Sequence, residues 1–513
     1  MTKNFYVTTP IYYVNDKPHI GHAYTSLAAD ILARFKRLDG YNVFFLTGTD
    51  EHGQKVEKSA IKQNKSPKEF CDEISIKFKK LADFMGYSYD YFIRTTDENH
   101  KKTAQKIWQI LEEKGFIYKD IYEGWYAIRD EAFYNEDEII DGKAPSGAEV
   151  IWERQESYFF KLSAFEKPLL DYIEDNPDFI SPNSKKNEVV SFIKSGLRDL
   201  SISRTSFNWG VKVPSDENHV MYVWLDALVN YLSALNFTKD DESDDRKLYQ
   251  DFWKNAANSP IHIVGKDILR FHAIYWPAFL MAAEIPLPKR IYAHGWWTNE
   301  GQKISKSTGN IIDPFEEIEW LKSKEIKEKT AIDYLRYFLI KEIPFGSDGN
   351  YAKEQLVNRV NSELANNIGN LTQRCLAMIH KNCEGIIKKD PNCPENPEII
   401  ENIRQKIEKL EFDRALDEII DFSNGINKEF NDHAPWNLKK EGKIDEMEQI
   451  LSNSAENIRK IAILLLPFLE HSAQMILSFL NVNKNHQNFS YFSKKLQKGG
   501  KINEIEAVFL RIK

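Results

Sequence analysis

The first fifty residues alternate between strand-like and helix-like patterns of hydrophobic positions. The stretch "NFYVTTP" at residues 4–10 is typical of a short buried strand, and "NVFFLTGTD" at residues 42–50 of a second one. Between them apolar residues recur at helical spacing, and Gly40 is a suitable stop signal. These helical positions are Leu27, Ile31, Leu32, Phe35 and Leu38. A strand, a helix and a strand in this order predict a βαβ unit at the centre of a parallel sheet.

Three further patterns organise the rest of the chain. The segments "HVMYVWLDALVNYLSAL" and "IHIVGKDILRFHAIYWPAFLMAA" also run from strand to helix, and we expect them to complete the sheet. Residues 116–213 are rich in Tyr, Trp and turn signals, which indicates an insertion. After about residue 351 the apolar spacing is helical almost throughout, which predicts an all-α bundle. The predicted fold class is therefore α/β.

Composition narrows the class of protein. A length of 513 residues predicts two to four domains, and 42% hydrophobic residues indicate a packed globular chain. The longest apolar run, residues 461–469, is too short for a bilayer, and the first ten residues lack a signal-peptide core. We therefore expect a cytoplasmic protein with no membrane partner. A net charge of −8 argues against nonspecific nucleic-acid binding, so an RNA partner would need local basic patches.

The first candidate for chemistry is His19-Ile20-Gly21-His22, at the start of the predicted helix. A helix N-terminus favours a phosphate, and two histidines one turn apart can both donate to its oxygens. Gly21 has no side chain, so a flat base could approach the backbone there. A capping histidine beside a surface histidine, or a metal site, remain alternatives for these residues.

The second candidate is the polar loop with the sequence "KISKS" at residues 303–307. Lys303 and Lys306 could close over a polyphosphate and stabilise the charge that develops on a departing pyrophosphate. A solvated charged loop is the alternative. The glycine-rich nucleotide loops G-x-x-x-x-G-K-[ST] and G-x-G-x-x-G do not occur in the chain.

Together, the two motifs resemble the signature of class I aminoacyl-tRNA synthetases. Several stretches are similar to methionyl-tRNA synthetases in particular: "TTPIYYVNDKPHIGHAYT", "LTGTDEHG", "DLSISR", "VMYVWLDALVNY", "GKDILRFHAIYWPA", "NNIGNLTQR" and "HAPWNLKK". The resemblance covers nearly the whole chain, and these stretches occur in the expected order. The insertion is too short for the editing domain of the leucine, isoleucine and valine enzymes, and the zinc-ligating cysteines of a cysteine enzyme are missing.

The resemblance implies a Rossmann-like parallel-sheet catalytic domain in two halves, with an inserted connective domain and a C-terminal α-helical bundle. The implied bounds are 1–115 and 214–298 for the catalytic halves, 116–213 for the connective domain, 299–355 for the KISKS loop and stem-contact segment, and 356–513 for the anticodon-binding domain. It also implies a methionine–tRNA ligase, which forms methionyl-adenylate from methionine and ATP and then transfers methionine to the terminal adenosine of tRNA(Met).

The resemblance assigns roles to individual residues. The catalytic residues would be His19, His22, Lys303 and Lys306. The ATP-binding residues would be His19, Gly21, His22, Gly265, Asp267 and Lys306. Asp50 would hold the methionine ammonium group, braced by Arg204. The methionine side chain would lie among Ile11, Tyr13, Trp224, Ala227, Tyr231, Ile268, Phe271, His272 and Trp276, because aromatic faces suit a polarisable thioether.

Several of these residues have plainer interpretations. Each aromatic residue of the methionine set could simply belong to the core, and Asp267 could cap a helix after a strand-end turn. In the helical region, Asn370 and Arg374 are four residues apart and share a helix face. With Trp436 they resemble the family's anticodon readers, which hydrogen-bond to and stack on unstacked bases. Surface solvation and an ordinary core tryptophan are the alternatives.

The sequence also departs from many relatives. Ala127 and Asp130 stand where zinc-ligating cysteines would be expected, and the four cysteines form no C-x-x-C pair, so we expect ATP and Mg²⁺ but no zinc. The chain ends soon after the bundle, without an added dimerising module, so we expect a monomer. Two other functions compete: a nucleotidylyltransferase that acts on another small substrate, and a non-catalytic RNA-binding paralogue.

Overall fold

The computed structural model describes residues 3–14, 17–127, 129, 132–134, 136–239, 246–254, 260–299, 302–303 and 311–513. The chain divides into two compact units. The sheet unit comprises residues 4–18 and 44–294, and the helical unit comprises residues 1–3, 19–43 and 295–513. Within the part of the chain that the structure describes, no helix is long and apolar enough to cross a membrane.

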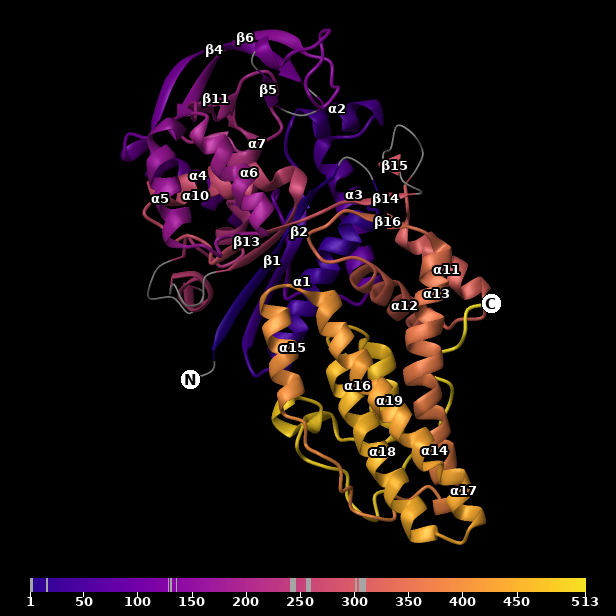
Figure 1. Ribbon diagram of the computed structural model, residues 1–513. Coiled ribbons are helices and arrows are strands. Elements are labelled where there is room, and N and C mark those ends of the chain that lie inside the picture. Colours follow the sequence, from indigo (N-terminus) through magenta and orange to yellow (C-terminus); the bar gives the residue numbers. More distant parts are fainter. Residues whose placement is uncertain are drawn as a thin grey trace. The chain divides into compact units, whose positions relative to one another are not determined.

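The sheet unit is built on six strands in the order β3-β2-β1-β12-β13-β7. Figure 1 labels β1, β2 and β13 of this sheet. Their bounds are β1 Asn4–Tyr13, β2 Asn42–Asp50, β3 Tyr91–Arg94, β7 Ile180–Ser181, β12 Ile261–Gly265 and β13 Arg290–His294. The pairs β2–β3, β1–β12, β12–β13 and β13–β7 are all parallel. Most side chains of β1 and β12 are buried, as expected for inner strands that are covered on both faces. The prediction of a parallel-sheet core is confirmed.

The expectation that "HVMYV" would add a strand to this sheet is wrong. β11 (Asp216–Met221) belongs to a separate three-stranded sheet, between β10 (Lys212–Val213) and β9 (Ser203–Arg204), and both pairings are antiparallel. β10 and β11 are joined by a short turn, so local hairpin pairing competes with distant pairing. Only the second half of β11 is buried, whereas an inner parallel strand needs an apolar environment along its whole length.

The insertion is a long antiparallel hairpin with two helices. β4 (Ile117–Ala127) pairs with β6 (Ile151–Phe160) along ten residues, and β5 (Ala132–Tyr134) and β8 (Leu200–Ser201) complete a four-stranded sheet. The helices that follow are α5 (Glu166–Asp175) and α6 (Asn183–Lys194). β7, which also falls between residues 116 and 213, is the outer strand of the main sheet. The domain bounds given above stay predictions.

Helices join the strands of the sheet unit. Those between β2 and β4 are α2 (Gln54–Lys62), α3 (Pro67–Phe84) and α4 (Glu98–Glu113). Two short helices, α7 (Val223–Leu228) and α8 (Asn230–Ser233), follow β11, and α10 (Trp276–Ala282) lies between β12 and β13. One large cluster of buried apolar side chains spans β1, α4, β6, α7 and α10, so the insertion and the main sheet share a core.

The helical unit contains α1 (Ile20–Leu38) and the C-terminal half of the chain. Its other strands and α-helices in the described part of the chain are β14 Trp297–Asn299, β15 Gln302–Lys303, β16 Gly349–Tyr351, α11 Pro314–Ser323, α12 Glu328–Lys341, α13 Lys353–Arg359, α14 Asn370–Cys383, α15 Glu398–Glu408, α16 Phe412–His433, α17 Pro435–Lys440, α18 Ile444–Leu465 and α19 Glu470–Phe479. A π-helix, η9 (Val360–Gly369), connects α13 to α14. α18 packs against α14, α16, α17 and α19 (Figure 1). The predicted C-terminal helical region is confirmed.

Two ion pairs, one buried and one partly exposed, tie α1 to other helices of this unit. Asp30, which is fully buried, accepts hydrogen bonds from Arg336 Nη2 at 2.7 Å and from Arg34 Nε at 2.8 Å. At the far end of α1, the guanidinium of Arg404 donates to both carboxylate oxygens of Asp39, at 2.8 and 3.0 Å. Charge-assisted bonds of this kind are directional, so α1 is positioned by α12 and α15.

Candidate active site

The two histidines of the first motif cap α1. His19 is the N-cap residue: its Nδ1 accepts a hydrogen bond from the Gly21 amide at 3.1 Å, and its own amide donates to Nδ1 of His22 at 3.0 Å. A ring nitrogen that accepts a hydrogen bond carries no proton, so in both neutral imidazoles the proton lies on Nε2. The ring centroids are 4.0 Å apart. Capping therefore prepares two adjacent Nε2–H donors at a helix N-terminus, where an anion is favoured.

Gly21 makes room for this arrangement. A Cβ atom at this position would lie 3.0 Å from Cε1 and 3.1 Å from Nδ1 of His19. These distances are tighter than ordinary van der Waals contacts, so a larger residue would push the His19 ring aside. The glycine therefore leaves room for the cap formed by His19. The approach of a flat base to Gly21 stays a prediction.

The start of α1 contacts both flanks of the second motif. The amide of Ile20 donates to the carbonyl of Ile312 at 2.9 Å, just after the loop. Tyr24 packs edge-on against Trp297 of β14, just before the loop, with centroids 5.7 Å apart. Lys306 lies outside the described residues, and of Lys303 only the backbone, in β15, is described. The helix start and the segments that flank the lysine motif are thus adjacent within one unit.

The predicted methionine-contacting residues gather in the sheet unit. Trp224 on α7 and Phe271 stack in parallel, with centroids 3.6 Å apart. Tyr231 and Trp276 are both almost fully buried, and their ring centroids lie 5.9 Å apart. The ring of His272 contacts the rings of Trp224 and Tyr231. Ile11, Tyr13 and Ile268 are partly buried against the same core, and Ala227 is buried. The structure therefore brings together residues that are up to 265 positions apart in the numbering.

Hydrogen bonds determine the tautomer of His272. Its Nδ1 is 3.0 Å from the carbonyl oxygen of Ile268, which can only accept, so Nδ1 carries the proton. Nε2 then accepts from the hydroxyl of Tyr231 at 2.7 Å. Burial lowers the pKa of His272 to about 4, so the ring is neutral at physiological pH. An uncharged aromatic wall suits an apolar ligand.

His262 is a buried polar residue next to Tyr231 and His272 that the sequence analysis did not single out. Its Nε2 accepts from the indole N–H of Trp276 at 3.3 Å, so Nδ1 carries the proton and donates to Thr8 Oγ1 at 2.8 Å. Burial, with a smaller contribution from His272, holds its pKa well below the ordinary range. The signal was present in "IHIVG": a histidine between isoleucines on a buried strand needs specific polar partners.

Asp50 and Arg204 occupy the same unit. Asp50 ends β2 and is largely buried, and its carbonyl accepts from the amide of Val14, next to the end of β1. Nη1 of Arg204 donates to Ser201 Oγ at 2.8 Å and to the Ser203 carbonyl at 2.7 Å. The bracing of Asp50 by Arg204 stays a prediction.

Gly265 and Asp267 follow the end of β12 closely. A Cβ atom on Gly265 would lie 2.5 Å from Oδ1 of Asp267, so the glycine allows that carboxylate to approach the backbone. Tyr13, Asp50 and Gly265 end three neighbouring strands of the sheet, and β1 and β12 are parallel. Ligands of α/β sheets bind outside such carboxyl ends.

Two of the three predicted anticodon residues are in contact. The guanidinium carbon of Arg374 lies 4.9 Å from the ring centroid of Trp436 and 5.3 Å from that of Phe430. Nη1 of Arg374 also donates to Oδ1 of Asn431 at 2.9 Å. Trp436 is 36% exposed, and Asn370 is exposed one turn before Arg374 on α14. One part of the Trp436 ring is thus exposed and another contacts Arg374; its role as a stacking surface for a base stays a prediction.

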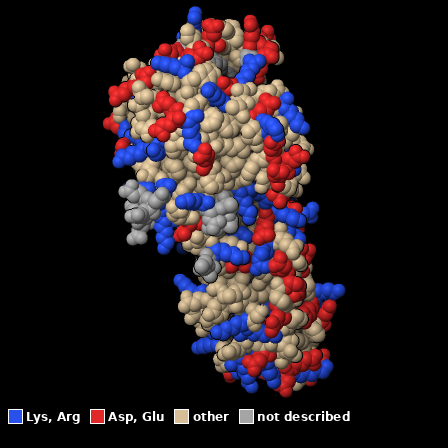
Figure 2. Space-filling model, turned by 90° about the vertical axis from the view of Figure 1, so that its left-hand side faces the viewer, with Lys and Arg blue, Asp and Glu red and all other residues tan. Residues whose placement is uncertain are grey.

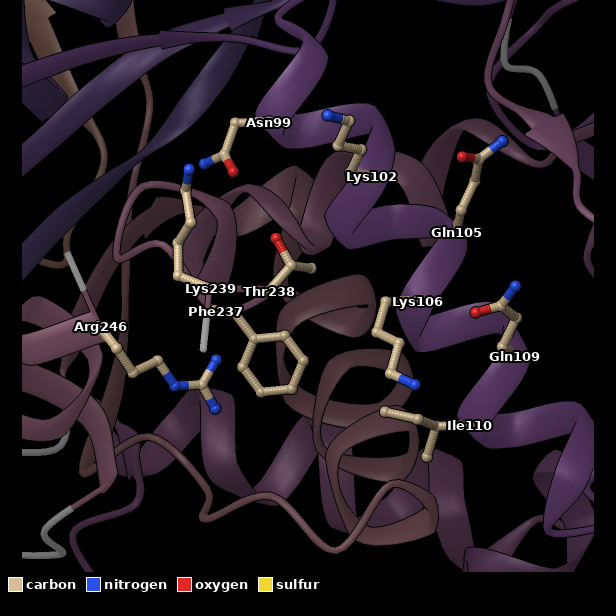
Figure 3. A pocket seen from close by; sticks show the side chains of 10 residues that line it. All are labelled: Asn99, Lys102, Gln105, Lys106, Gln109, Ile110, Phe237, Thr238, Lys239 and Arg246. Atoms are coloured by element: carbon tan, nitrogen blue, oxygen red, sulfur yellow. The ribbon is translucent and has the colours of Figure 1, made fainter. Parts of the chain in front are cut away.

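A basic cavity of about 720 Å³ lies elsewhere in the sheet unit, along α4 (Figure 3). None of the predicted site residues lines it. The lining side chains are Asn99, Lys102, Gln105, Lys106, Gln109, Ile110, Phe237, Thr238, Lys239 and Arg246. On the face drawn in Figure 2, basic and acidic side chains are interspersed, so charge alone does not mark an RNA surface there.

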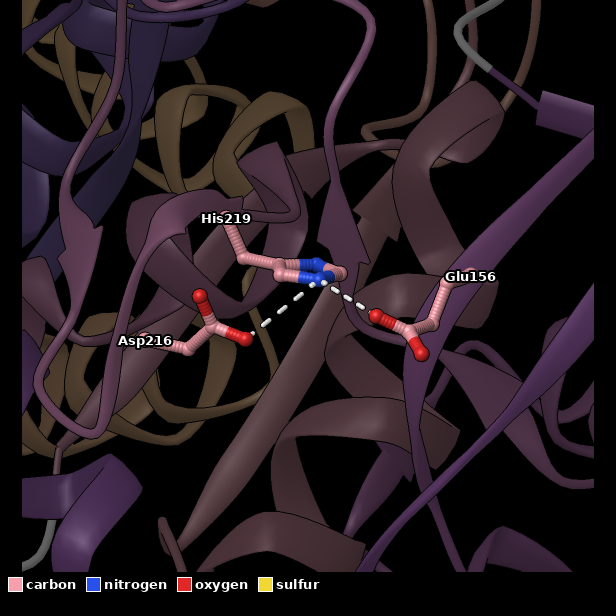
Figure 4. A group of neighbouring side chains, drawn as sticks. All are labelled: Glu156, Asp216 and His219. Atoms are coloured by element: carbon pink, nitrogen blue, oxygen red, sulfur yellow. Dashed lines mark ion pairs between the residues drawn. The ribbon is translucent and has the colours of Figure 1, made fainter.

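One group in the described part of the chain could hold a metal ion, namely Glu156, Asp216 and His219 (Figure 4). The ammonium group of Lys119 lies 2.6 Å from Glu156 Oε1 and 3.1 Å from Asp216 Oδ2. Hydrogen bonds from Lys119 lower the pKa of both carboxyl groups. A lysine already supplies the positive charge that these carboxylates need, so we assign no metal to them.

Comparison with known proteins identifies the class. A family model described as "tRNA synthetases class I (M)" matches residues 5–150 and 144–376. The chain therefore has the fold and the two signature motifs of a class I aminoacyl-tRNA synthetase.

Individual relatives narrow this further. A methionine–tRNA ligase of Rickettsia conorii is 51% identical to this chain in an alignment that covers 99% of each protein. A methionine–tRNA ligase of Rhizobium meliloti is 46% identical over 99% of this chain and 98% of the relative. A Mycobacterium tuberculosis methionyl-tRNA synthetase in complex with methionyl-adenylate superposes with a TM-score of 0.93 at 41% identity, over 99% of this chain and all of that one. The chain belongs to the methionyl-tRNA synthetase family.

The contact between Gly265 and Asp267 generates a prediction. The resemblance implies that the Asp267 carboxylate accepts hydrogen bonds from the ribose hydroxyls of ATP. In Gly265→Ala the new methyl group would displace this carboxylate, so the KM for ATP should rise about tenfold, as expected for the loss of one charge-assisted hydrogen bond. The KM for methionine should change little. Both are measured by ATP–pyrophosphate exchange.

Gly425→Ala is the matched control. Gly425 lies within α16, and a Cβ atom there would meet no atom within 4 Å, so activity should be unchanged. An unaltered KM for ATP in Gly265→Ala would mean that Asp267 does not hold the ribose.

Proposed function

We propose that the protein joins methionine to tRNA(Met) in two steps on the residues described above. In the first step a carboxylate oxygen of methionine attacks the α-phosphorus of ATP, and the bond to pyrophosphate breaks. The carboxylate is already ionised, so no general base is needed. Catalysis then consists of positioning and of stabilising charge on the phosphates.

The observation that carries this proposal is the capping geometry of His19 and His22. Because each Nδ1 accepts a backbone hydrogen bond, each Nε2 is a donor that can serve a phosphate oxygen. Lys303 and Lys306 would stabilise the leaving pyrophosphate, and Gly21, Gly265 and Asp267 would hold the adenosine. Mg²⁺ would arrive with ATP and neutralise charge on its phosphates, which would be its main ligands.

Methionine would be recognised at both of its ends. Asp50 would pair with the ammonium group, and the stacked pair Trp224–Phe271 would form one wall for the thioether. Tyr231 and His272 would form another wall. The hydrogen bond between them supports this role. Because the Tyr231 hydroxyl already donates its proton to His272, an amino acid with a polar side chain would find no free hydrogen-bond donor in this pair, whereas methionine needs none.

In the second step the terminal adenosine of the tRNA would attack the activated carbonyl, through its 2′-OH as the class suggests, and AMP would leave. Asn370, Arg374 and Trp436 would read the anticodon. The contact of Arg374 with Trp436 supports this, since it holds an indole ring partly exposed and ready to stack on a base. A monomeric state, a cytoplasmic location and the absence of zinc stay predictions.

A substitution at His22 separates capping from phosphate binding. In His22→Asn the side-chain oxygen can replace Nδ1 as acceptor for the His19 amide, whereas the Nε2–H donor is lost. We expect methionine-dependent ATP–pyrophosphate exchange to slow by about 100-fold or more, with a nearly unchanged thermal midpoint. His22→Ala should lose both activity and stability. Exchange at the wild-type rate in His22→Asn would contradict the proposed role.

Trp436 provides an independent test of the RNA role. Trp436→Ala should leave pyrophosphate exchange intact and weaken aminoacylation of tRNA by about 10- to 100-fold, since stacking of a base contributes about 1–3 kcal/mol. Ile444→Ala removes a similarly exposed apolar side chain from α18 and should affect neither reaction. If Trp436→Ala reduces both reactions equally, Trp436 is a structural residue.

A further inference from the structure

The sheet unit contains a buried polar network that the proposed mechanism does not use. Asp226, on α7, has no exposed surface. Its Oδ2 lies 2.6 Å from Nδ1 of His52, and its Oδ1 lies 2.7 Å from Nε2 of His100 on α4. The second nitrogen of His100 lies 3.1 Å from Ser233 Oγ on α8. A buried carboxylate is costly unless it is fully hydrogen-bonded, so the arrangement strongly constrains its members.

Members of this network are close in sequence to residues that we propose to bind methionine. His52 comes two residues after Asp50, and Asp226 lies between Trp224 and Ala227. One carboxylate therefore connects the segment that would bind the methionine ammonium group to the helix that would contact the methionine side chain. His100 adds α4 as a third support.

The residue between Asp50 and His52 is held equally firmly. Glu51 is fully buried, and its carboxylate accepts from Nε and Nη2 of Arg94 at 2.6 and 2.9 Å. It also accepts from the hydroxyls of Thr49 and Thr96, at 2.7 and 2.5 Å. The end of β2 thus cannot shift without breaking several charge-assisted hydrogen bonds, and Asp226 is its link to α7.

We propose that Asp226 is a positioning residue for methionine, which sets the separation between the Asp50 carboxylate and the Trp224–Ala227 wall. This inference rests on the roles proposed above for Asp50 and Trp224. Methionine is short, so a site that binds its ammonium group and its thioether must hold two walls at one separation. A shift of about 1 Å in such a site can cost as much as 100-fold in rate or affinity.

The test compares Asp226→Ala with Asp226→Asn by pyrophosphate exchange. Asparagine can accept from Nδ1 of His52 and donate to Nε2 of His100, so it can preserve the connection without the charge. We expect Asp226→Ala to raise the KM for methionine at least tenfold while the KM for ATP changes less than about twofold. Asp226→Asn should restore the KM for methionine to within about threefold of wild type.

Asp333→Ala is the matched control. Asp333 is a buried carboxylate of the helical unit that accepts from the Ser472 amide at 2.7 Å, so its loss should lower stability without changing the KM for methionine. If Asp226→Ala does not fold, His52→Ala against His52→Asn replaces it, because the asparagine amide can mimic the Nδ1–H donor to Asp226. The same selective rise in the KM for methionine is then expected in His52→Ala.

Three results would be decisive. A KM for methionine that stays at the wild-type value in Asp226→Ala overturns the inference, and so does a proportional rise of both KM values. Absence of methionine-dependent exchange in the wild-type protein would instead refute the proposed function.

Discussion

Two hydrogen bonds at the first turn of α1 carry the chemistry that we assign to this protein. They satisfy backbone amides with the Nδ1 atoms of His19 and His22, and thereby leave the proton of each neutral ring on Nε2. A histidine in solution exchanges between tautomers, whereas these two are held in the form that can donate to an anion. The same contacts stabilise the helix, so the structural role of these two residues and the catalytic role that we propose for them depend on the same hydrogen bonds.

Contacts within the helical unit determine where the first turn of α1 lies. Ile20 and Tyr24 contact the two flanks of the lysine loop, and Asp30 is held by Arg336 in the buried interior. Farther along α1, Asp39 pairs with Arg404. The residues proposed to bind phosphate and those proposed to read the anticodon therefore belong to one compact unit, and its segment that contains α1 begins at His19. The residues proposed to recognise methionine belong to the other.

Much of this organisation was predictable from the sequence. Apolar runs predicted the buried strands β1, β2 and β12, and helical spacing of apolar residues predicted the helices of the C-terminal region. Both predictions were confirmed. β11 was misassigned because a strand-like pattern does not reveal its partner, and a hairpin neighbour was available. The motifs identified His19 and His22, but periodicity could not reveal that both Nδ1 atoms face backbone amides.

The residues that sequence reasoning missed share a physical character. His262 and Asp226 are buried polar groups whose roles depend on partners far away in the chain, at Thr8 and Trp276 for one and at His52 and His100 for the other. A buried histidine or aspartate signals that partners must exist, but only the fold identifies them. Burial keeps the pKa of His262 low and its ring neutral, whereas Asp226 is a buried carboxylate; hydrogen bonds fix both groups beside residues proposed to bind methionine.

The tautomers of His19 and His22 can be measured directly. Long-range ¹H–¹⁵N correlation spectra of protein labelled with ¹⁵N-histidine distinguish a protonated ring nitrogen from an unprotonated one, and His19→Asn and His22→Asn spectra assign the two signals. At neutral pH both rings should carry the proton on Nε2 with an unprotonated Nδ1, and both Nε2–H signals should shift when ATP binds. A proton on Nδ1 of either ring, or signals that ignore ATP, would contradict the account.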